Sequence, residues 1–329
     1  MARIALVHDI AGVAGVQAKL LRGAGHDVDE IALPRTGESW GWPAKGIALP
    51  FRVAAYRPAI DRLRNGAYDV IHIHWLTQGI TGVLAARPFI VQAHGSDVHA
   101  HMRNPAYRAV TRSVLKRADA VLYVTPDLRE PLKDFDSKLR YVPNPVDVDA
   151  LAPTTTPTRV DKVLIFTRLD AVKGVDRIFA AVERLRPMVE ITAVEWGEVA
   201  RSYSRQYSRW VDFVAPVPHA AIGPFLQRFD AVIGQMGSGA LGLSEIEALA
   251  AGRPVITGID WNLYRGGDPP PVVGASDPDA IVKAVEDLQL GRTDVGALVT
   301  QGMDWARRNH GFERHLSLLE AVYFGSPVK

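Results

Sequence analysis

The stretch AVIGQMGSGALGLSEIEALAAGRPVIT, residues 231–257, contains a strand, a loop, a helix and a second strand in direct succession. The apolar run Ala231–Ile233 predicts a buried strand, and so does Pro254–Thr257 at the other end. Between them, three glycines at 237, 239 and 242 lead into the helical segment Ser244–Ala251. A strand joined by a helix to another strand indicates a parallel sheet with a right-handed crossover.

The same alternation extends over the rest of the chain. Further short apolar runs, continuous rather than alternating, predict strands that are covered on both faces; they are Ile4–Val7, Val70–Ile73, Phe89–Gln92, Ala120–Val124, Val163–Phe166, Ile191–Val194 and Trp210–Val214. Helical stretches lie between them, at Val16–Gly25, Phe51–Asn65, Asn104–Ala118 and Val175–Leu185, and again at Met303–Asn309 and Phe312–Tyr323. The predicted class is α/β with doubly wound parallel sheets. One segment, Val199–Arg209, has tyrosines among serines and arginines and is expected to be a loop.

Length and composition limit the classes of protein to consider. A chain of 329 residues indicates about two domains, and 47% hydrophobic residues are sufficient for large cores. The balance of 38 Lys and Arg against 36 Asp and Glu argues against nucleic acid as the main partner. Because the chain has no cysteine, disulfides, thiol nucleophiles and thiolate zinc sites are excluded.

The segment Ala152–Thr158, rich in proline and threonine, is expected to run extended between two similar halves. It divides the chain into an N-terminal Rossmann-like domain (1–152), a linker (153–158), a C-terminal Rossmann-like domain (159–307) and a C-terminal helix (308–329). We expect that helix to pack back on the first domain. The strand-like Ile4–Val7 follows the N-terminus directly, and no apolar run approaches the ~20 residues of a membrane span, so a cytoplasmic protein is expected.

The glycine-containing loop is the first candidate site. Backbone N–H groups of Gly237, Ser238, Gly239, Ala240, Leu241 and Gly242, together with the positive end of the following helix, suit a diphosphate. A tight turn would also need glycines without any ligand.

A second candidate site supplies positive charge. Arg168 and Lys173 lie in the loop Thr167–Gly174, after the first strand of the second half. Doubly wound folds bind ligands at the carboxyl ends of their strands, and both side chains suit phosphate oxygens. A solvated pair of surface cations is the alternative.

Histidines gather after two strands of the first half. His72 and His74 share one strand face, and His99 and His101 have the same spacing near His94. A metal site would need a third ligand in each case, so histidines that pack and form hydrogen bonds in the core are preferred.

Taken in order, these residues resemble the retaining glycosyltransferases of family 4, which have the GT-B fold. The resemblance covers nearly the whole chain. It depends on Asp69–Trp75, the His-Gly-Ser-Asp sequence at 94–97, the Pro-Asn-Pro-Val-Asp sequence at 143–147, Arg168 with Lys173-Gly174, and Glu247–Val255.

The resemblance implies two Rossmann-like domains that face each other across a cleft, with the donor held mainly by the second. It implies that Arg168 and Lys173 bind the diphosphate of a nucleotide sugar, and that Glu247 accepts both ribose hydroxyls. His94 corresponds to the histidine beside the donor sugar. Gly12 and Gly15 correspond to the loop that closes over the diphosphate or admits the acceptor, although here the sequence is Ala-Gly-Val-Ala-Gly.

One position departs from the family pattern. The family has two glutamates separated by seven residues, and the position that corresponds to the first is Gly239. Glu245 has the wrong spacing to replace it. The carboxylate expected to contact the donor sugar is therefore absent.

The function expected from these features is metal-independent transfer, with retention, of a sugar from a nucleoside diphosphate sugar to an unidentified acceptor. Arg168, Lys173 and the loop amides would stabilise the leaving diphosphate, with His94 as a further catalytic residue and no cofactor or metal. A nucleotide-sugar binding protein without turnover is the alternative. A nicotinamide oxidoreductase is disfavoured, because the first turn lacks Gly-x-Gly-x-x-Gly.

A cluster of positive charge lies in the first half, here called the basic face: Arg103, Arg108, Arg112, Lys116 and Arg117. Three of these residues share one helical stripe. Weak peripheral contact with an anionic membrane is one interpretation, and a solvated helix surface is the preferred one.

Overall fold

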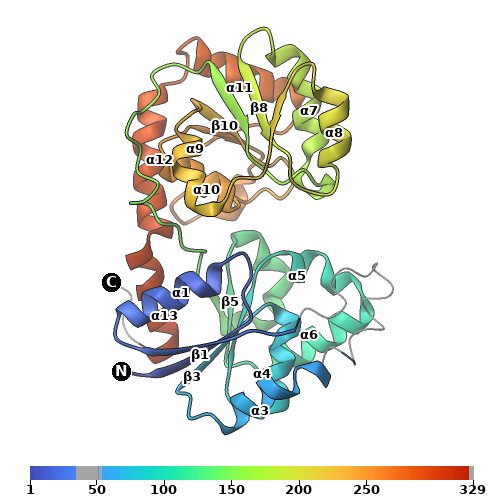
Figure 1. Cartoon of the computed structure of the whole chain (residues 1–329), viewed down its shortest axis with the longest axis vertical. Helices are drawn as coiled ribbons and strands as arrows, with labels where there is room; N and C mark the ends of the chain where they lie inside the picture. Colours follow the sequence, from blue (N-terminus) through green and yellow to red (C-terminus); the bar gives the residue numbers. More distant parts are fainter. Residues whose placement is uncertain (35–50, 52–53, 326–329) are drawn as a thin grey trace. The chain divides into compact units, whose positions relative to one another are not determined.

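The structure is a computed structural model, and it describes residues 1–34, 51 and 54–325. The chain forms two compact units, Met1–Pro145 with the segment from His315 onward, and Val146–Arg314. Each unit contains a six-stranded parallel sheet. The predicted α/β, doubly wound class is confirmed (Figure 1).

The first sheet has the strand order β2-β1-β3-β4-β5-β6. Its strands are β1 (Arg3–Val7), β2 (Asp27–Ile31), β3 (Val70–His74), β4 (Ile90–Ala93), β5 (Ala120–Tyr123) and β6 (Leu139–Tyr141). The helices of this unit are α1 (Val13–Gly23), α3 (Arg57–Asn65), α4 (Ile80–Ala85), α5 (Ser96–His99), α6 (Pro105–Arg117) and α13 (Phe312–Phe324).

Apolar side chains cover both faces of this sheet. Leu63 of α3 and Val114 of α6 are buried on one face. On the other, Leu21 of α1 and Leu319 of α13 pack with Ile4 of β1. The C-terminal helix α13 is therefore part of the core of the first unit (Figure 1).

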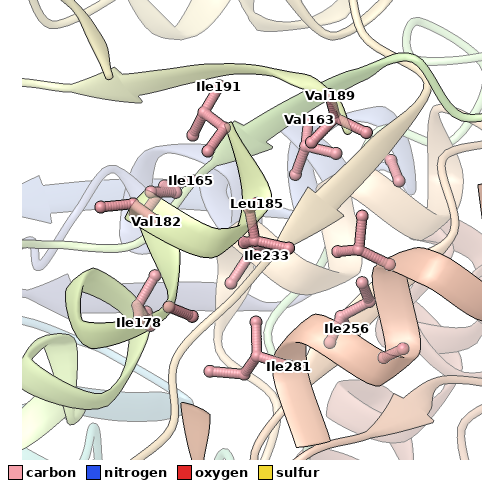
Figure 2. Packing of buried hydrophobic residues seen from close by; sticks show 14 of the residues in the cluster. Val163, Ile165, Ile178, Val182, Leu185, Val189, Ile191, Ile233, Ile256 and Ile281 are labelled. Atoms are coloured by element: carbon pink, nitrogen blue, oxygen red, sulfur yellow. The ribbon is translucent and has the colours of Figure 1, made fainter. Parts of the chain in front are cut away.

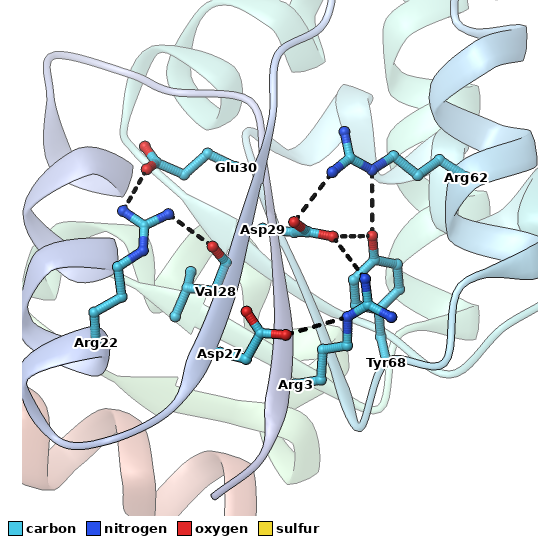
Figure 3. A network of polar contacts seen from close by, with 8 residues as sticks. All are labelled: Arg3, Arg22, Asp27, Val28, Asp29, Glu30, Arg62 and Tyr68. Atoms are coloured by element: carbon cyan, nitrogen blue, oxygen red, sulfur yellow. Dashed lines mark hydrogen bonds and ion pairs between the residues drawn. The ribbon is translucent and has the colours of Figure 1, made fainter.

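A polar network joins the edge strand β2 to its neighbours (Figure 3). Asp29 of β2 accepts a hydrogen bond from the hydroxyl of Tyr68 and pairs with Arg62 of α3 at 3.1 Å and with Arg3 of β1 at 3.4 Å. The Tyr68 hydrogen bond, followed by the guanidinium of Arg62, lowers the pKa of Asp29. The network fixes a strand in which three of the five side chains are carboxylates and only Val28 and Ile31 are buried.

The second sheet has the order β12-β11-β10-β7-β8-β9. Its strands are β7 (Lys162–Ile165), β8 (Glu190–Val194), β9 (Asp212–Val214), β10 (Ala231–Ile233), β11 (Val255–Thr257) and β12 (Val273–Gly274). The helices are α7 (Val175–Leu185), α8 (Ala200–Tyr207), α9 (Ile222–Leu226), α10 (Leu243–Ala250), α11 (Pro278–Gln289) and α12 (Val295–His310).

Aliphatic side chains fill the layer between this sheet and two of its helices. Ile178 and Leu185 of α7 and Ile281 of α11 lie against strand residues such as Ile165 and Ile233 (Figure 2). On the opposite face, α9, α10 and α12 contribute Leu226, Leu249 and Trp305. Strands covered on both faces explain the continuous apolar runs.

Two features differ from the expectations. Val199–Arg209 is not a loop, because α8 occupies Ala200–Tyr207, and Tyr203 and Tyr207 pack on Phe179 at ring-centroid distances of 4.7 and 4.9 Å. The division between the units falls at Pro145, before the segment expected to be the linker, since Val146 and Leu151 are buried in the core of the second unit. In the part of the chain that the structure describes, no helix is both long and apolar enough to cross a membrane.

Candidate active site

Two loops of the second unit follow neighbouring strands at the centre of its sheet. The order of the strands reverses between β7 and β10, which are paired in register from Ala231 with Val163 to Ile233 with Ile165. Ligands of doubly wound folds bind beyond the carboxyl ends of strands at such a switch point. The loop 167–174 follows β7, and the glycine loop 237–242 follows β10.

The loop after β7 is held in place by its own polar contacts. Asp170 is 5% exposed; it accepts a hydrogen bond from the Glu198 backbone N–H at 2.7 Å and forms a short ion pair with the Nε of Arg168. The indole N–H of Trp196 donates to the Thr167 carbonyl at 2.9 Å. Lys173 ends a short 3₁₀ turn and has no carboxylate partner among the described residues. Of the two predicted cations, Arg168 therefore forms an ion pair within the protein, whereas the ammonium of Lys173 has no carboxylate partner in the part of the chain that the structure describes.

The glycine loop packs directly on this turn. The Met236 N–H donates to the Lys173 carbonyl at 2.7 Å, and a Cβ on Gly237 would lie 2.1 Å from the Val172 carbonyl oxygen. Glycine is thus required at 237 for contact between two segments of backbone. The structure brings the two predicted phosphate-binding segments together at one point.

Most of the loop amides are already used within the protein. The N–H groups of Gly237 and Ser238 donate to the Gln235 side-chain oxygen at 2.7 and 2.6 Å, and that of Leu241 donates to the Tyr264 hydroxyl at 3.1 Å. The Gly242 N–H donates to Glu245 at 3.1 Å. Internal acceptors thus occupy four of the six amides predicted to bind a diphosphate, and their binding of a diphosphate stays a prediction.

Gln235 and Glu245 organise the loop, and sequence reasoning missed this role of both. Gln235 is buried, and its amide also donates to the carbonyls of Ala240 and Gly258. Glu245 is buried as well and accepts the Gln235 backbone N–H at 2.7 Å. The signal for Glu245 was its place three residues after Gly242, where a carboxylate can close a helix N-terminus.

Glu247 lies in α10, and its side chain is 9% exposed. It accepts a hydrogen bond from the Nε2 of His219, at 3.1 Å, and this hydrogen bond raises the pKa of His219. His219 itself is 80% exposed and was not predicted. One oxygen of Glu247, the predicted ribose acceptor, is therefore engaged by an exposed imidazole.

Gly239 has φ +74, the left-handed conformation that was expected from its place in the turn. Its carbonyl accepts the Asp260 N–H at 2.9 Å, and a Cβ at 239 would lie 3.0 Å from the Cβ of Asp260. A side chain at this position meets both backbone strain and a neighbour.

In the first unit, His94 follows β4 and is partly exposed. Its ring stacks on Trp75, and its Nε2 lies 3.0 Å from the Nδ1 of His74. Asp97, which is fully buried, accepts the backbone N–H groups of His94, Gly95 and Leu76 at 2.9–3.0 Å. Burial raises the pKa of Asp97 to about 6, although these hydrogen bonds lower it. Asp97, which sequence reasoning did not assign, holds the loop that presents His94.

The two glycines after β1 have different positions. Gly12 has φ +77 and caps α1, whereas Gly15 lies inside that helix rather than in a loop. Asp9 accepts the Ala14 N–H at 2.9 Å and fixes the start of the helix. The predicted loop is therefore shorter than expected.

The remaining histidines have separate protein partners. His72 contacts the Tyr323 hydroxyl at 2.6 Å, His99 contacts Asp127 at 2.6 Å, and His101 accepts the Trp75 indole N–H at 3.3 Å. Among the described residues no group of three or more candidate ligands could hold a metal ion.

Two parallel sheets with loops of this kind define the architecture of the GT-B glycosyltransferases, and solved structures of that class have the same fold. Sucrose-phosphate synthase from Thermosynechococcus elongatus has a TM-score of 0.75 at 17% identity, with 98% of each chain covered. Anabaena HepE in complex with UDP and glucose has a TM-score of 0.73 at 12% identity, covering 97% of this chain and 98% of that one.

The family is indicated by sequence comparison. The model of Glycosyltransferase Family 4 matches residues 14–150. A GDP-mannose-dependent α-(1-6)-phosphatidylinositol monomannoside mannosyltransferase of Mycolicibacterium smegmatis is 27% identical over 68% of this chain and 66% of its own length. A D-inositol 3-phosphate glycosyltransferase of Corynebacterium jeikeium is 25% identical over 75% of this chain and 73% of its own. These matches confirm the resemblance to family 4 glycosyltransferases with the GT-B fold.

Proposed function

We propose that this chain transfers a sugar, with retention and without a metal ion, from a nucleoside diphosphate sugar to an acceptor. The observation that carries the proposal is the direct packing of the Arg168–Lys173 turn on the glycine loop at the switch point of the second sheet. Similar proteins support the donor class, since one relative is GDP-mannose-dependent and HepE is solved with UDP-glucose.

In this proposal the diphosphate leaves between two cations. Lys173 supplies an uncommitted ammonium, and Arg168 keeps terminal N–H groups beyond the Nε that Asp170 contacts. Positive charge at the departing phosphate stabilises an oxocarbenium-like transition state, and the leaving phosphate takes the proton of the acceptor. Glu247 accepts from the ribose, and His94 contacts the donor sugar.

No cofactor is part of the proposal. Two cationic side chains can replace a divalent ion at the diphosphate, because they provide fixed positive charge without reorganisation. We place the enzyme in the cytoplasm, where nucleotide sugars are available, with a solvated helix surface as the preferred interpretation of the basic face and weak membrane contact as the alternative. All five residues of the basic face are exposed, although Arg112 pairs with Asp134 at 3.4 Å and Arg117 donates to Ser113 at 2.7 Å.

The test is ¹H NMR of donor turnover in EDTA-treated protein, with UDP-, GDP- and ADP-linked α-sugars and water as the acceptor. Retention predicts that the α-anomer of the free sugar appears first, before mutarotation. Lys173→Ala should abolish most of this signal, whereas Lys162→Ala, an exposed lysine at the other end of β7, should not. Release of the β-anomer first, or turnover only after a metal is added, would refute the proposal.

A nucleotide-sugar binding protein without turnover is the second candidate. The absence of a carboxylate side chain at Gly239 favours it, since the donor sugar loses one anchoring group there. Nucleotide binding that stabilises the protein, without turnover of any donor in the panel, would establish this candidate.

A further inference from the structure

One face of the first sheet contains a buried polar layer between otherwise apolar helices. His72 and His74 of β3, Gln92 of β4 and Gln17 of α1 are each completely buried there. His74 and Gln92 are register partners on adjacent strands. Such a layer costs free energy unless its groups are hydrogen-bonded, so its arrangement needs an explanation.

The layer leads from the C-terminal helix to His94. The Tyr323 hydroxyl of α13 contacts the Nδ1 of His72 at 2.6 Å, and the ring of His72 stacks on that of His74 with centroids 4.5 Å apart. The Nδ1 of His74 then lies 3.0 Å from the Nε2 of His94. His74 is thus the one residue of the layer that forms a hydrogen bond with the ring of His94.

All three imidazoles are neutral at physiological pH. Burial, with smaller contributions from neighbouring histidines, lowers the pKa of His72 to about 3 and lowers the pKa values of His74 and His94 as well. A neutral imidazole has one N–H and one bare nitrogen. A single proton therefore lies between His74 and His94, and either ring could donate it.

The burial of His74 decides which ring donates. Its Nε2 is buried and has no partner among the described residues. If His94 donated, His74 would carry its own proton on that Nε2, and a buried N–H without an acceptor is the costlier defect. If His74 donates, its Nε2 is a bare lone pair. Among the described residues that lone pair has no donor, which is the lesser of the two defects.

The opposite polarity would need an acceptor for the Nε2–H of His74. The Nε2 of His72 is unpartnered as well, and the unpartnered side-chain oxygen among the four residues of the layer is that of Gln17. The amide nitrogen of Gln17 already contacts Gln92 at 3.3 Å and His315 at 3.1 Å. These contacts hold the Gln17 side chain in its present orientation.

We propose that His74 is a positioning residue that donates its Nδ1–H to the Nε2 of His94 and thereby fixes His94 as the Nδ1–H tautomer. The ring of His94 then offers a hydrogen-bond donor at neutral pH to an acceptor oxygen such as a sugar hydroxyl or phosphate oxygen. Only the identity of that ligand rests on the proposed function, because the hydrogen bond exists without it.

The test is the long-range ¹H–¹⁵N spectrum of ¹⁵N-histidine-labelled protein between pH 5.5 and 8, in which ring nitrogen shifts distinguish the two neutral tautomers from the cation. Assignment uses His94→Gln, which removes one set of signals. We expect His94 and His74 to give Nδ1–H patterns that do not titrate over this range. An Nε2–H pattern for His94 in the wild-type protein would overturn the proposal without any variant.

Two variants separate positioning from packing. His74→Leu keeps an apolar volume but removes the donor, so the signals of His94 should move towards the Nε2–H tautomer. His72→Phe is the matched control, because it alters the same layer without touching the hydrogen bond of His94. If His74→Leu folds and leaves the shifts of His94 unchanged, the proposal is wrong; if it does not fold, the wild-type tautomer decides.

Donor turnover provides a functional test of the role of His74. His74→Leu should lower the turnover number by up to roughly tenfold, the effect of one hydrogen bond, and leave nucleotide affinity unchanged. His74→Asn, whose amide can donate from a similar place, should restore part of the turnover. Absence of nucleotide binding would refute the proposed function, but it would leave the tautomer measurement intact.

Discussion

Acidification from pH 6.5 to pH 5 should destabilise the first unit steeply. His72, His74 and His94 have lowered pKa values in the folded protein, whereas an unfolded histidine titrates near 6.5. In this range the unfolded chain therefore binds more protons than the folded one. Their contribution to stability is complete above pH 6.5 and is lost as the pH falls.

Of two other groups of this unit with shifted pKa values, Asp97 and His99, only Asp97 modifies the slope below pH 6. Asp97, with its pKa raised to about 6, binds a proton more readily when folded, so between pH 4 and 6 it opposes one histidine. The hydrogen bond from His99 to Asp127 raises the pKa of His99, which is charged in both states below pH 6.5 and adds no slope there. About two protons remain, and each contributes about 1.4 kcal/mol per pH unit. The expected loss is thus roughly 3 kcal/mol per pH unit below pH 6.

Amide hydrogen exchange in β3 and β4, corrected for the intrinsic exchange rate at each pH, measures the free energy of opening of this unit alone. His72→Phe should reduce the slope by about 1.4 kcal/mol per pH unit, because one buried imidazole is gone. His219→Ala, in the other unit, should leave it unchanged. A free energy of opening that is constant between pH 7 and 5, or an unchanged slope in His72→Phe, would refute the reasoning.

Four further outcomes are expected. Lys173→Ala should weaken nucleoside diphosphate binding by about 1.5–3 kcal/mol in calorimetry. Equal affinity in Lys173→Ala and the Lys162→Ala control would show that Lys173 does not bind the diphosphate. His219 has a raised pKa, and once protonated it competes with the ribose for the carboxylate of Glu247. Nucleotide affinity should therefore fall as the pH drops through the pKa of His219, and His219→Ala should flatten this pH dependence. The affinity for pyrophosphate, which has no ribose, should be the same in the wild-type protein and in His219→Ala. Gly239→Glu should lower the free energy of unfolding by roughly 1 kcal/mol or more, measured by thermal melting, without raising donor turnover. A melting temperature equal to that of the wild-type protein would show that a side chain at 239 causes no backbone strain. A solvated basic face, the preferred interpretation, predicts that the protein does not sediment with anionic vesicles at low salt. Binding that is lost at high salt and abolished by charge reversal of the basic face would instead establish membrane contact.

Much of the fold could be predicted because strands that are buried on both faces have continuous apolar sequences. Val163–Phe166 and Ala231–Ile233 are apolar at nearly every position and were identified within a residue or two of β7 and β10. The edge strand β2 was missed, since Asp27–Ile31 has only two apolar residues, three positions apart, and is fixed by ion pairs with other segments. The helix α8 was missed because its tyrosines cover Phe179, a contact that no local pattern reveals.

The location of the candidate site could be predicted from the sequence, but the hydrogen-bond partners of its backbone amides could not. Glycines and cations at strand ends identify the two loops, since the position follows from sheet topology. Which acceptor holds each amide depends on side chains such as Gln235 and Tyr264, the second of which lies more than twenty residues from the amide it accepts. Likewise, the contact between His219 and Glu247 joins a loop to a helix that the sequence separates.

The contribution of α13 to the first unit has a consequence for biosynthesis. The layer over β1 and β3 is completed by Leu319 and Tyr323, residues that follow the entire second unit along the chain. On the ribosome, Val146–Arg314 can therefore reach its full set of internal contacts while the strands translated before it still have an uncovered apolar face. That face is a candidate for chaperone binding until the last helix is synthesised. The first unit, although translated first, can therefore complete its core only after the second unit has been synthesised.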